Sequence, residues 1–313
     1  MHEHEQVKFN HHDSVLFNES LKGLNIKSSG VYVDATVGRG GHTKGILDSI
    51  GKSGKVLGLD QDIEAIKYVK ENLKDPRLNL IHCNFSELNG HLEKLKLIGR
   101  VDGILMDLGI SSPQLDNSER GFSFNKNGAL DMRMDQSQKM TAAIWLRESS
   151  EKVIADALYQ FGEEKRSRVI ASKIKEYQKS KYIETTFELA DLIKTIVKPG
   201  KNKHPATRSF QAIRIAINEE LKMLSEALDQ TLDALEKKGR LAVISFHSIE
   251  DRIVKQFIQK HSRPMQLPKG LPIITDSSNQ LILKDLGKIK PSAQEVKNNK
   301  RARSAILRVV EKC

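Results

Sequence analysis

Apolar and polar positions follow two different periods over the first third of the chain. Short β-branched, apolar runs at 31–36, 55–60, 78–84 and 101–109 have the length of strands. The amphipathic segments between them, clearest at 62–73, have the period of helices. Strands that alternate with helices form βαβ units, and runs this continuously apolar are typical of strands buried on both faces. The pattern therefore predicts a parallel sheet with helices on both sides.

The pattern changes after the fourth predicted strand. Residues 111–127 are polar and rich in Gly and Ser, which predicts a loop. Residues 140–198 have helical periodicity without a strand candidate, and they end at Lys198-Pro199-Gly200, because proline cannot continue a helix. We therefore expect an all-helical insertion.

Strand and helix signals resume towards the C-terminus. The pattern predicts helices at 207–235 and 250–261 and strands at 240–248 and 305–310. The sequence thus predicts a discontinuous α/β core, made of residues 1–113 and 207–313, interrupted by a helical domain at 114–206.

Charge indicates the kind of partner. The 313 residues carry 51 Lys and Arg against 40 Asp and Glu, a formal net charge of +11. The excess lies in the later part of the chain, since the net charge is −1 over 1–110, +4 over 111–206 and +8 over 207–313. Clustered Lys and Arg attract phosphate at long range, so this distribution favours a nucleic-acid partner.

Several classes of protein are excluded by simple features. No run approaches the roughly 18 apolar residues that a membrane span needs, and the N-terminus lacks the apolar segment of a secretory signal. Two cysteines, Cys83 and Cys313, cannot form a disulfide framework. The histidines near the N-terminus lack a partner cluster at ligand spacing, so no metal site is expected. We expect a cytoplasmic protein without a membrane segment.

A glycine turn follows the first predicted strand. It contains Gly38, Gly40 and Gly41, and the third glycine of a dinucleotide motif is replaced by Thr43. Glycines let the backbone approach a nucleotide-like ligand, and the N-terminus of the next helix offers free N–H groups. Asp60 ends the second strand, where a carboxylate can accept both ribose hydroxyls. These residues predict a nucleotide-cofactor site and leave a nicotinamide-dependent oxidoreductase as an alternative.

The end of the fourth strand carries a second candidate site. Asp107 is followed by Ser111, Ser112 and Pro113 at the carboxyl edge of the predicted sheet, where open α/β sheets bind ligands. Enzymes that methylate exocyclic amines have an acid or amide, Ser–Pro–Pro–aromatic tetrad in this position, and the Ser112-Pro113 pair matches it only in part. Cys83 lies within a strand, which argues against a methyltransferase that must add a thiolate to a pyrimidine.

Many strings along the chain resemble one family, the RsmH (MraW) methyltransferases of small-subunit rRNA. The match runs in order over almost the whole sequence, so it is far more specific than a single glycine motif. The matching strings are GRGGHT at 38–43, MDLGISSPQLD at 106–116, RGFSF at 120–124, LDMRM at 130–134, HPATR at 204–208, FQAIRI at 210–215, SFHSIEDRIVK at 245–255 and RARS at 301–304.

The resemblance implies a fold, a reaction and a set of residues. The fold would be the Rossmann-like core of class I S-adenosylmethionine-dependent methyltransferases with a helical insertion. The reaction would be methylation of the N4 amine of a cytidine in the decoding region of 16S rRNA. The sequence leaves open whether naked rRNA or the assembled small ribosomal subunit is the substrate, with the subunit favoured, and whether the enzyme is a monomer or a homodimer. Carried over by position, the cofactor contacts would be Gly40, Gly41, His42, Asp60, Phe85, Asp107 and Gln114.

Two further roles are hypotheses about this sequence. We expect Asp107, Ser111, Ser112 or the Pro113 carbonyl to accept a hydrogen bond from the cytosine amine. We expect Arg208, Arg301 and Arg303 to hold the RNA backbone. A non-enzymatic RNA-binding module is the other alternative, and it would bind RNA in a salt-dependent way without turnover.

Overall fold

The computed structural model describes residues 14–200, 204–264 and 281–313. The four N-terminal histidines, His2, His4, His11 and His12, lie outside this range. The described residues divide into two compact units, one drawn from 1–109 and 222–313 and the other from 110–221. Within these residues no group of three or more His, Cys, Asp or Glu side chains could hold a metal ion. None of the helices there is long and apolar enough to cross a bilayer.

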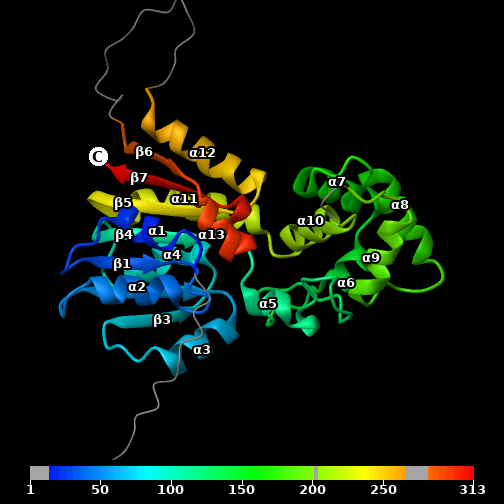
Figure 1. Ribbon diagram of the computed structural model, residues 1–313, viewed down its shortest axis with the longest axis horizontal. Coiled ribbons are helices and arrows are strands. Elements are labelled where there is room, and N and C mark those ends of the chain that lie inside the picture. Colours follow the sequence, from blue (N-terminus) through cyan, green and yellow to red (C-terminus); the bar gives the residue numbers. More distant parts are fainter. Residues whose placement is uncertain (1–13, 201–203, 265–280) are drawn as a thin grey trace, which may run out of the picture. The chain divides into compact units, whose positions relative to one another are not determined.

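The first unit is built on a seven-stranded sheet in the order β3-β2-β1-β4-β5-β7-β6 (Figure 1). Neighbouring strands from β3 to β5 pair in parallel, and β7 pairs antiparallel with both β5 and β6. The predicted parallel sheet is confirmed. The strands are β1 (Val31–Asp34), β2 (Lys55–Asp60), β3 (Leu78–His82), β4 (Val101–Asp107), β5 (Leu235–Ser245), β6 (Leu283–Ile289) and β7 (Ile306–Lys312).

Both faces of this sheet are buried, because successive side chains of a strand point to opposite sides. Ile104 and Met106 of β4 belong to one apolar cluster, and Leu105 between them belongs to another. Helices α4, α11 and α12 contribute to the first cluster, whereas α1 and α2 contribute to the second. The helices of this unit are α1 (Phe17–Leu24), α2 (Gly41–Ser49), α3 (Ile63–Asn72), η1 (Phe85–Glu87), α4 (Leu88–Lys94), α11 (Glu220–Ala234), α12 (Ser248–Ser262), α13 (Ala293–Asn298) and η4 (Lys300–Ser304).

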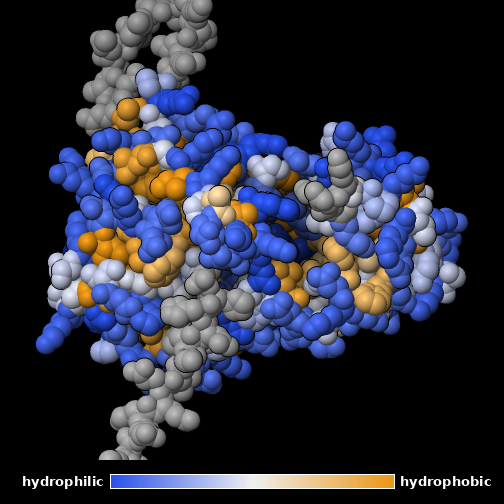
Figure 2. Space-filling model, viewed as in Figure 1, coloured by the Kyte–Doolittle hydropathy of each residue, from blue (hydrophilic) through white to orange (hydrophobic). Residues whose placement is uncertain are grey.

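Strand β6 was not predicted by the hydrophobic pattern. Its only buried residue is Leu283, and charged residues and a bulge at Asp285–Gly287 interrupt any apolar alternation. As the edge strand it pairs on one side only, and Leu286 and Ile289 stay exposed there. Figure 2 shows apolar side chains gathered over β6 and β7 on an otherwise mostly hydrophilic face. Edge strands need less apolar surface than central ones, which explains the missing signal.

The second unit is helical and has its own apolar core. Side-chain caps start three of its helices, from Thr141, Ser150 and Thr185. The stretch predicted as a loop at 111–127 contains α5 and η2, because Ser111 and Gln114 form a capping box there. The helices are α5 (Ser112–Asp116), η2 (Ser118–Arg120), α6 (Ala142–Glu148), α7 (Glu151–Gly162), α8 (Ser167–Tyr177), α9 (Thr186–Lys194) and α10 (Thr207–Ile217).

The prediction of a single helix at 207–235 is wrong. The structure breaks it into α10 and α11 at Asn218, and Glu219 adopts a left-handed backbone with φ 48°. The buried Asn218 amide donates to the carbonyls of Met132 and Arg214 at 2.8 Å, and its oxygen accepts from the Met134 N–H at 2.8 Å. Helix α10 also packs against α7 and belongs to the second unit, so this unit extends beyond the predicted 114–206 range.

Replacing Asn218 with Ala should destabilise the second unit. The change removes the partner of two buried backbone groups, the Met134 N–H and the Met132 carbonyl, and each such group costs about 1–3 kcal/mol. The Arg214 carbonyl keeps the backbone N–H of residue 218. We expect a lower urea midpoint followed by the fluorescence of Trp145, the chain's single tryptophan, which packs in this unit. The matched control is Asn72→Ala on the exposed face of α3, and an equal loss in both variants would contradict the role of Asn218.

Candidate functional site

The glycine turn after β1 is held by a buried carboxylate. Asp34 ends β1, and its Oδ2 accepts from the Thr43 hydroxyl at 2.6 Å while its Oδ1 accepts from the Thr36 N–H at 3.2 Å. Gly40 precedes α2 with φ 77°, a left-handed conformation that glycine adopts without strain. A Cβ at this position would also lie 3.1 Å from the Val69 side chain. The sequence therefore uses glycine here for both backbone freedom and close packing.

Asp60 links the end of β2 to the same turn. Its Oδ2 accepts from the Gly38 N–H at 2.8 Å, and its Oδ1 accepts from the Asp62 N–H at 2.8 Å. Burial raises the pKa of Asp60 to about 6, although these two donors oppose the shift. Each carboxylate oxygen keeps a further acceptor position, so the group can still bind hydroxyls.

Asp107 ends β4, and its backbone N–H donates to the Thr36 hydroxyl at 2.6 Å. Its Oδ1 is buried and has no hydrogen-bond partner among the described residues. Its Oδ2 lies 3.6 Å from Nε2 of His42. Burial raises the pKa of Asp107 to about 8, and the carboxylates of Asp34 and Glu250 act in the same direction. An unpaired buried oxygen at the edge of a sheet marks a place for a ligand donor.

His42, in the first turn of α2, is 5% exposed. Its ring stacks on Phe17 of α1, with the centroids 5.8 Å apart. Burial lowers the pKa of His42 to about 4, and the Val15 backbone opposes this shift only in part. The imidazole is therefore neutral at physiological pH.

The structure brings six predicted residues to the carboxyl ends of parallel strands in the first unit. Gly40, Gly41 and His42 follow β1, and Asp60 ends β2. Phe85 follows β3, where it starts η1 and packs partly buried against the core, and Asp107 ends β4. These contacts with a cofactor stay predictions.

The other predicted residues belong to other elements. Ser111, Ser112, Pro113 and Gln114 belong to the second unit, where the Gln114 side chain accepts from the Ser111 N–H at 2.9 Å. The backbone-capping role of Gln114 was not anticipated. The arginines are exposed: Arg208 is on α10, and its guanidinium donates to the Glu163 carbonyl at 3.2 Å, whereas Arg301 and Arg303 are in η4.

Two residues of the site went unnoticed in the sequence. Thr36 accepts the Asp107 N–H through its hydroxyl, and Phe17 covers the His42 ring. A threonine next to the glycine turn gave a local signal, but Phe17 comes from a separate helix, and no spacing pattern links it to His42.

His247 and Glu250 form a capping pair at the start of α12, with Nε2 3.0 Å from Oε1.

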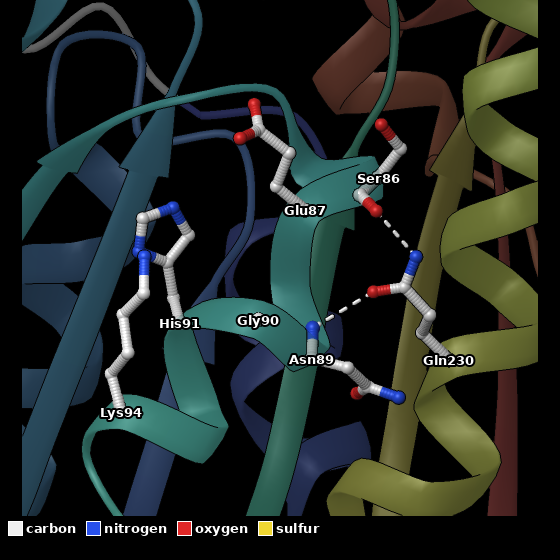
Figure 3. A pocket seen from close by; sticks show the side chains of 7 residues that line it. All are labelled: Ser86, Glu87, Asn89, Gly90, His91, Lys94 and Gln230. Atoms are coloured by element: carbon white, nitrogen blue, oxygen red, sulfur yellow. Dashed lines mark hydrogen bonds between the residues drawn. The ribbon is translucent and has the colours of Figure 1, made fainter.

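A shallow pocket of about 400 Å³ lies between η1–α4 and α11, next to Phe85 in the sequence (Figure 3). The Gln230 side chain of α11 binds the opposite wall: its oxygen accepts from the Asn89 N–H at 2.8 Å, and its amide nitrogen donates to the Ser86 carbonyl. Glu87, His91 and Lys94 line the remainder. None of the predicted site residues lines this pocket.

Comparison with known proteins identifies the family. The model of the MraW methylase family matches residues 9–313. The chain belongs to this family. A ribosomal RNA small subunit methyltransferase H of Vesicomyosocius okutanii subsp. Calyptogena okutanii (strain HA) is 59% identical over 302 residues, which cover 96% of this chain and 98% of the relative. The same enzyme of Ruthia magnifica subsp. Calyptogena magnifica is 57% identical over 304 residues, covering 97% and 99%.

A solved rRNA methylase of Streptococcus thermophilus aligns over 96% of both chains with 14% identity and a TM-score of 0.43, a likeness too distant to argue from. As an MraW methylase the chain is a methyltransferase, and S-adenosylmethionine is its methyl donor. The nicotinamide-dependent oxidoreductase and the non-enzymatic RNA-binding module are therefore excluded.

The residues at the strand ends fit this cofactor. Among the described residues, a Cβ at Gly38 would come within 4.0 Å of the Thr36 carbonyl alone, which leaves room beside the turn. Asp60 offers acceptor positions for ribose hydroxyls. Asp34 and Asp60, with pKa values of about 6, are ionised at neutral pH and make the environment favourable for a cation, and the methyl donor is a sulfonium.

Replacing Asp107 with Asn should make the ligand-free protein more stable at high pH. The pKa of Asp107 rises from 3.8 to about 8 on folding, so the folded chain holds a proton that the unfolded chain releases. The stability from this neutral form is fully present below about pH 4 and is lost as the pH rises towards 8. Asn cannot ionise and keeps its contribution throughout.

We expect the melting temperature of Asp107→Asn to exceed that of the wild type by about 3 °C or more at pH 8, and by much less at pH 5. The control is Asp48→Asn, whose side chain is 63% exposed. A difference between Asp107→Asn and the wild type that does not change with pH would contradict the shift.

Proposed function

We propose that this methyltransferase transfers the methyl group of S-adenosylmethionine to the N4 amine of a cytidine in the decoding region of 16S rRNA. Two relatives that span nearly the whole chain at 57–59% identity carry the name ribosomal RNA small subunit methyltransferase H, and this observation carries the proposal. The substrate is the rRNA within the small ribosomal subunit, in the cytoplasm.

The chemistry asks for three things at the strand ends. Cytosine N4 is a poor nucleophile because its lone pair is delocalised into the ring, so the amine must be held in line with the methyl group. Positioning of this kind is worth roughly 7–11 kcal/mol. The amine also needs a hydrogen-bond acceptor and, once it has attacked, a group that takes its proton. S-adenosylmethionine supplies an electrophilic methyl group on a sulfonium sulfur.

Asp107 is our candidate for the acceptor. Its Oδ1 is buried and unpaired among the described residues, so a donor from the substrate would satisfy it. Ser111, Ser112 and the Pro113 carbonyl follow Asp107 closely along the chain, and they are the other candidates for contact with the amine. Gly40, Gly41, His42, Asp60, Phe85 and Gln114 complete the proposed set of cofactor contacts.

Exposed arginines of both units are our candidates for contact with the RNA backbone. Arg208 lies on α10 of the helical unit, and Arg301 and Arg303 lie in η4 of the sheet unit. The target base must leave its stack to reach a strand-end site, at a cost of about a few kcal/mol, and contacts to phosphate offset this cost. We propose that the helical unit, 110–221, recognises the substrate RNA.

Incubation with methyl-labelled S-adenosylmethionine should test the reaction directly. We expect the label in N4-methylcytidine after nucleoside digestion of unmethylated small subunits, and a comparison with naked 16S rRNA identifies the better substrate. Asp107→Ala should abolish turnover, whereas Asp48→Ala, on the exposed side of α2, should keep it. Label in another nucleoside would refute the proposed position of methylation, and full activity of Asp107→Ala would remove Asp107 from the mechanism.

The arginines are tested by binding at several salt concentrations. We expect weaker RNA binding in each of three variants, Arg208→Ala, Arg301→Ala and Arg303→Ala. The slope of log K against log salt should become less steep by about 0.7–0.9 for each phosphate that the protein no longer neutralises. The matched control is Arg100→Ala, since Arg100 is exposed just before β4, at the opposite edge of the sheet from Asp107. Salt slopes equal to that of Arg100→Ala would exclude the three arginines from the interface.

A further inference from the structure

The side chain of His42 has no evident task in the cofactor site. A glycine-turn residue can contact a cofactor through its backbone alone, yet the sequence places an imidazole here and buries it to 5% exposure. Neither ring nitrogen makes a hydrogen bond of ordinary geometry among the described residues, although the Val15 backbone interacts with the ring and raises its pKa against the effect of burial. Burying such a polar group costs about 1–3 kcal/mol when it stays unpaired. The cost points to a partner that is engaged only during binding or reaction.

Besides the Val15 backbone, one charged side chain is within reach of the ring. Nε2 of His42 lies 3.6 Å from Oδ2 of Asp107, slightly too far for a hydrogen bond. Hydrogen bonds of catalytic groups are often long in ligand-free enzymes and shorten in the substrate complex. The ring is fixed against rotation by its stacking on Phe17, so a small movement of the Asp107 side chain closes the gap.

The surrounding charges decide which group holds the proton. The carboxyls of Asp34 at the end of β1 and Glu250 on α12 both act on Asp107, and His247 pairs with Glu250. Asp60 and Asp62, at the end of β2, add further negative charge to this edge of the sheet. Crowded acids and burial keep a proton on Asp107, whereas burial keeps His42 neutral. A neutral imidazole has one nitrogen that can accept a hydrogen bond.

We propose that His42 is a positioning residue for Asp107, in that Nε2 accepts a hydrogen bond from the protonated Oδ2 and so leaves Oδ1 to accept one from the cytosine amine. This inference rests on the proposed function. It gives the two carboxyl oxygens different tasks: Oδ2 faces the imidazole, and Oδ1, the atom without a partner, faces the substrate.

The arrangement also gives the amine proton a destination. After its N–C bond has formed, the amine nitrogen is positively charged and releases a proton to Oδ1. Oδ2 passes its own proton to Nε2 at the same time, so Asp107 stays neutral and His42 becomes an imidazolium. The methyl donor would lose its positive charge earlier, when its S–CH3 bond breaks as the N–C bond forms and the electron pair stays on sulfur. The charge thus moves first to the amine nitrogen and then to His42, and the total charge of the site does not change. The imidazolium later returns its proton to solvent.

Nuclear magnetic resonance of ¹⁵N-histidine-labelled protein tests the contact without turnover. We expect His42 to be neutral from pH 5 to 8 with Nε2 unprotonated, and its Nε2 resonance to move when Asp107→Ala removes the donor. The signal is assigned by its absence from His42→Phe, among the 10 histidines of the chain. A protonated Nε2, or a resonance that Asp107→Ala leaves unchanged in both the free and the S-adenosylhomocysteine-bound protein, would overturn the proposal.

Kinetics separate positioning from simple cofactor contact. His42→Phe keeps a ring for stacking on Phe17 but lacks Nε2, so kcat should fall at least about tenfold while the KM values for cofactor and RNA stay within about threefold. His42→Gln, which offers an acceptor oxygen, should regain part of kcat. The matched control is His91→Phe on α4, outside the site, with unchanged kcat. Unchanged kcat in His42→Phe, or a loss confined to KM, would exclude the role.

Failure of the proposed function and failure of the His42 role give different results. If the wild type forms no N4-methylcytidine, the proposed function fails, whereas the resonance measurements still decide whether His42 and Asp107 are paired. Melting curves identify any variant that does not fold. If His42→Phe proves to be such a variant, the His42 resonance is assigned by its absence from His42→Gln, and the wild type and Asp107→Ala together decide the question.

Discussion

The site depends on one constraint, the desolvation of carboxyl groups at the C-terminal ends of the parallel strands. Asp34, Asp60 and Asp107 end three adjacent parallel strands, and burial raises the pKa of each of them. Ionising all three without a counter-charge is costly, because like charges in a poorly solvated region repel one another. A cationic ligand offsets the charges of Asp34 and Asp60, while Asp107 keeps its proton. The strand ends therefore carry negative charge without a counter-charge until a positive group binds. This is the property expected of a site for a sulfonium.

Short hydrogen bonds between neighbouring strand ends keep this unfavourable arrangement in place. Thr36 is central to them, since its hydroxyl accepts the Asp107 N–H and its own N–H donates to Asp34. The turn after β1 is thereby tied to the end of β4, the strand that lies next to it across the change in strand order. Ligands of open α/β sheets bind at such a point because the connections on either side leave in opposite directions. The strand order leaves room for a ligand at the ends of β1 and β4, and the hydrogen bonds of Thr36 hold these two strand ends together.

The hydrophobic pattern predicted the central sheet because its strands are buried on both faces, so that runs such as 101–107 are apolar almost throughout. It missed β6, which pairs with a described strand on one side only and tolerates charges. It also joined α10 to α11, because the break depends on Asn218 reaching the carbonyl of Met132, a contact between residues far apart in the sequence. Motifs located Asp60 and Asp107, whereas Phe17 was invisible to them because it acts only through tertiary packing.

The contrast between Asp60 and Asp107 shows why two similar residues suit different work. Both end a parallel strand and both are shifted by burial, but each oxygen of Asp60 already accepts a backbone N–H. Those donors favour the charged form and hold the carboxylate still, which suits a group that binds neutral hydroxyls. Asp107 has no such donors on Oδ1, so its proton is held more strongly and its free oxygen can respond to a reacting amine. The number of backbone donors at each carboxyl, more than its position on the sheet, separates a binding acid from a reactive one.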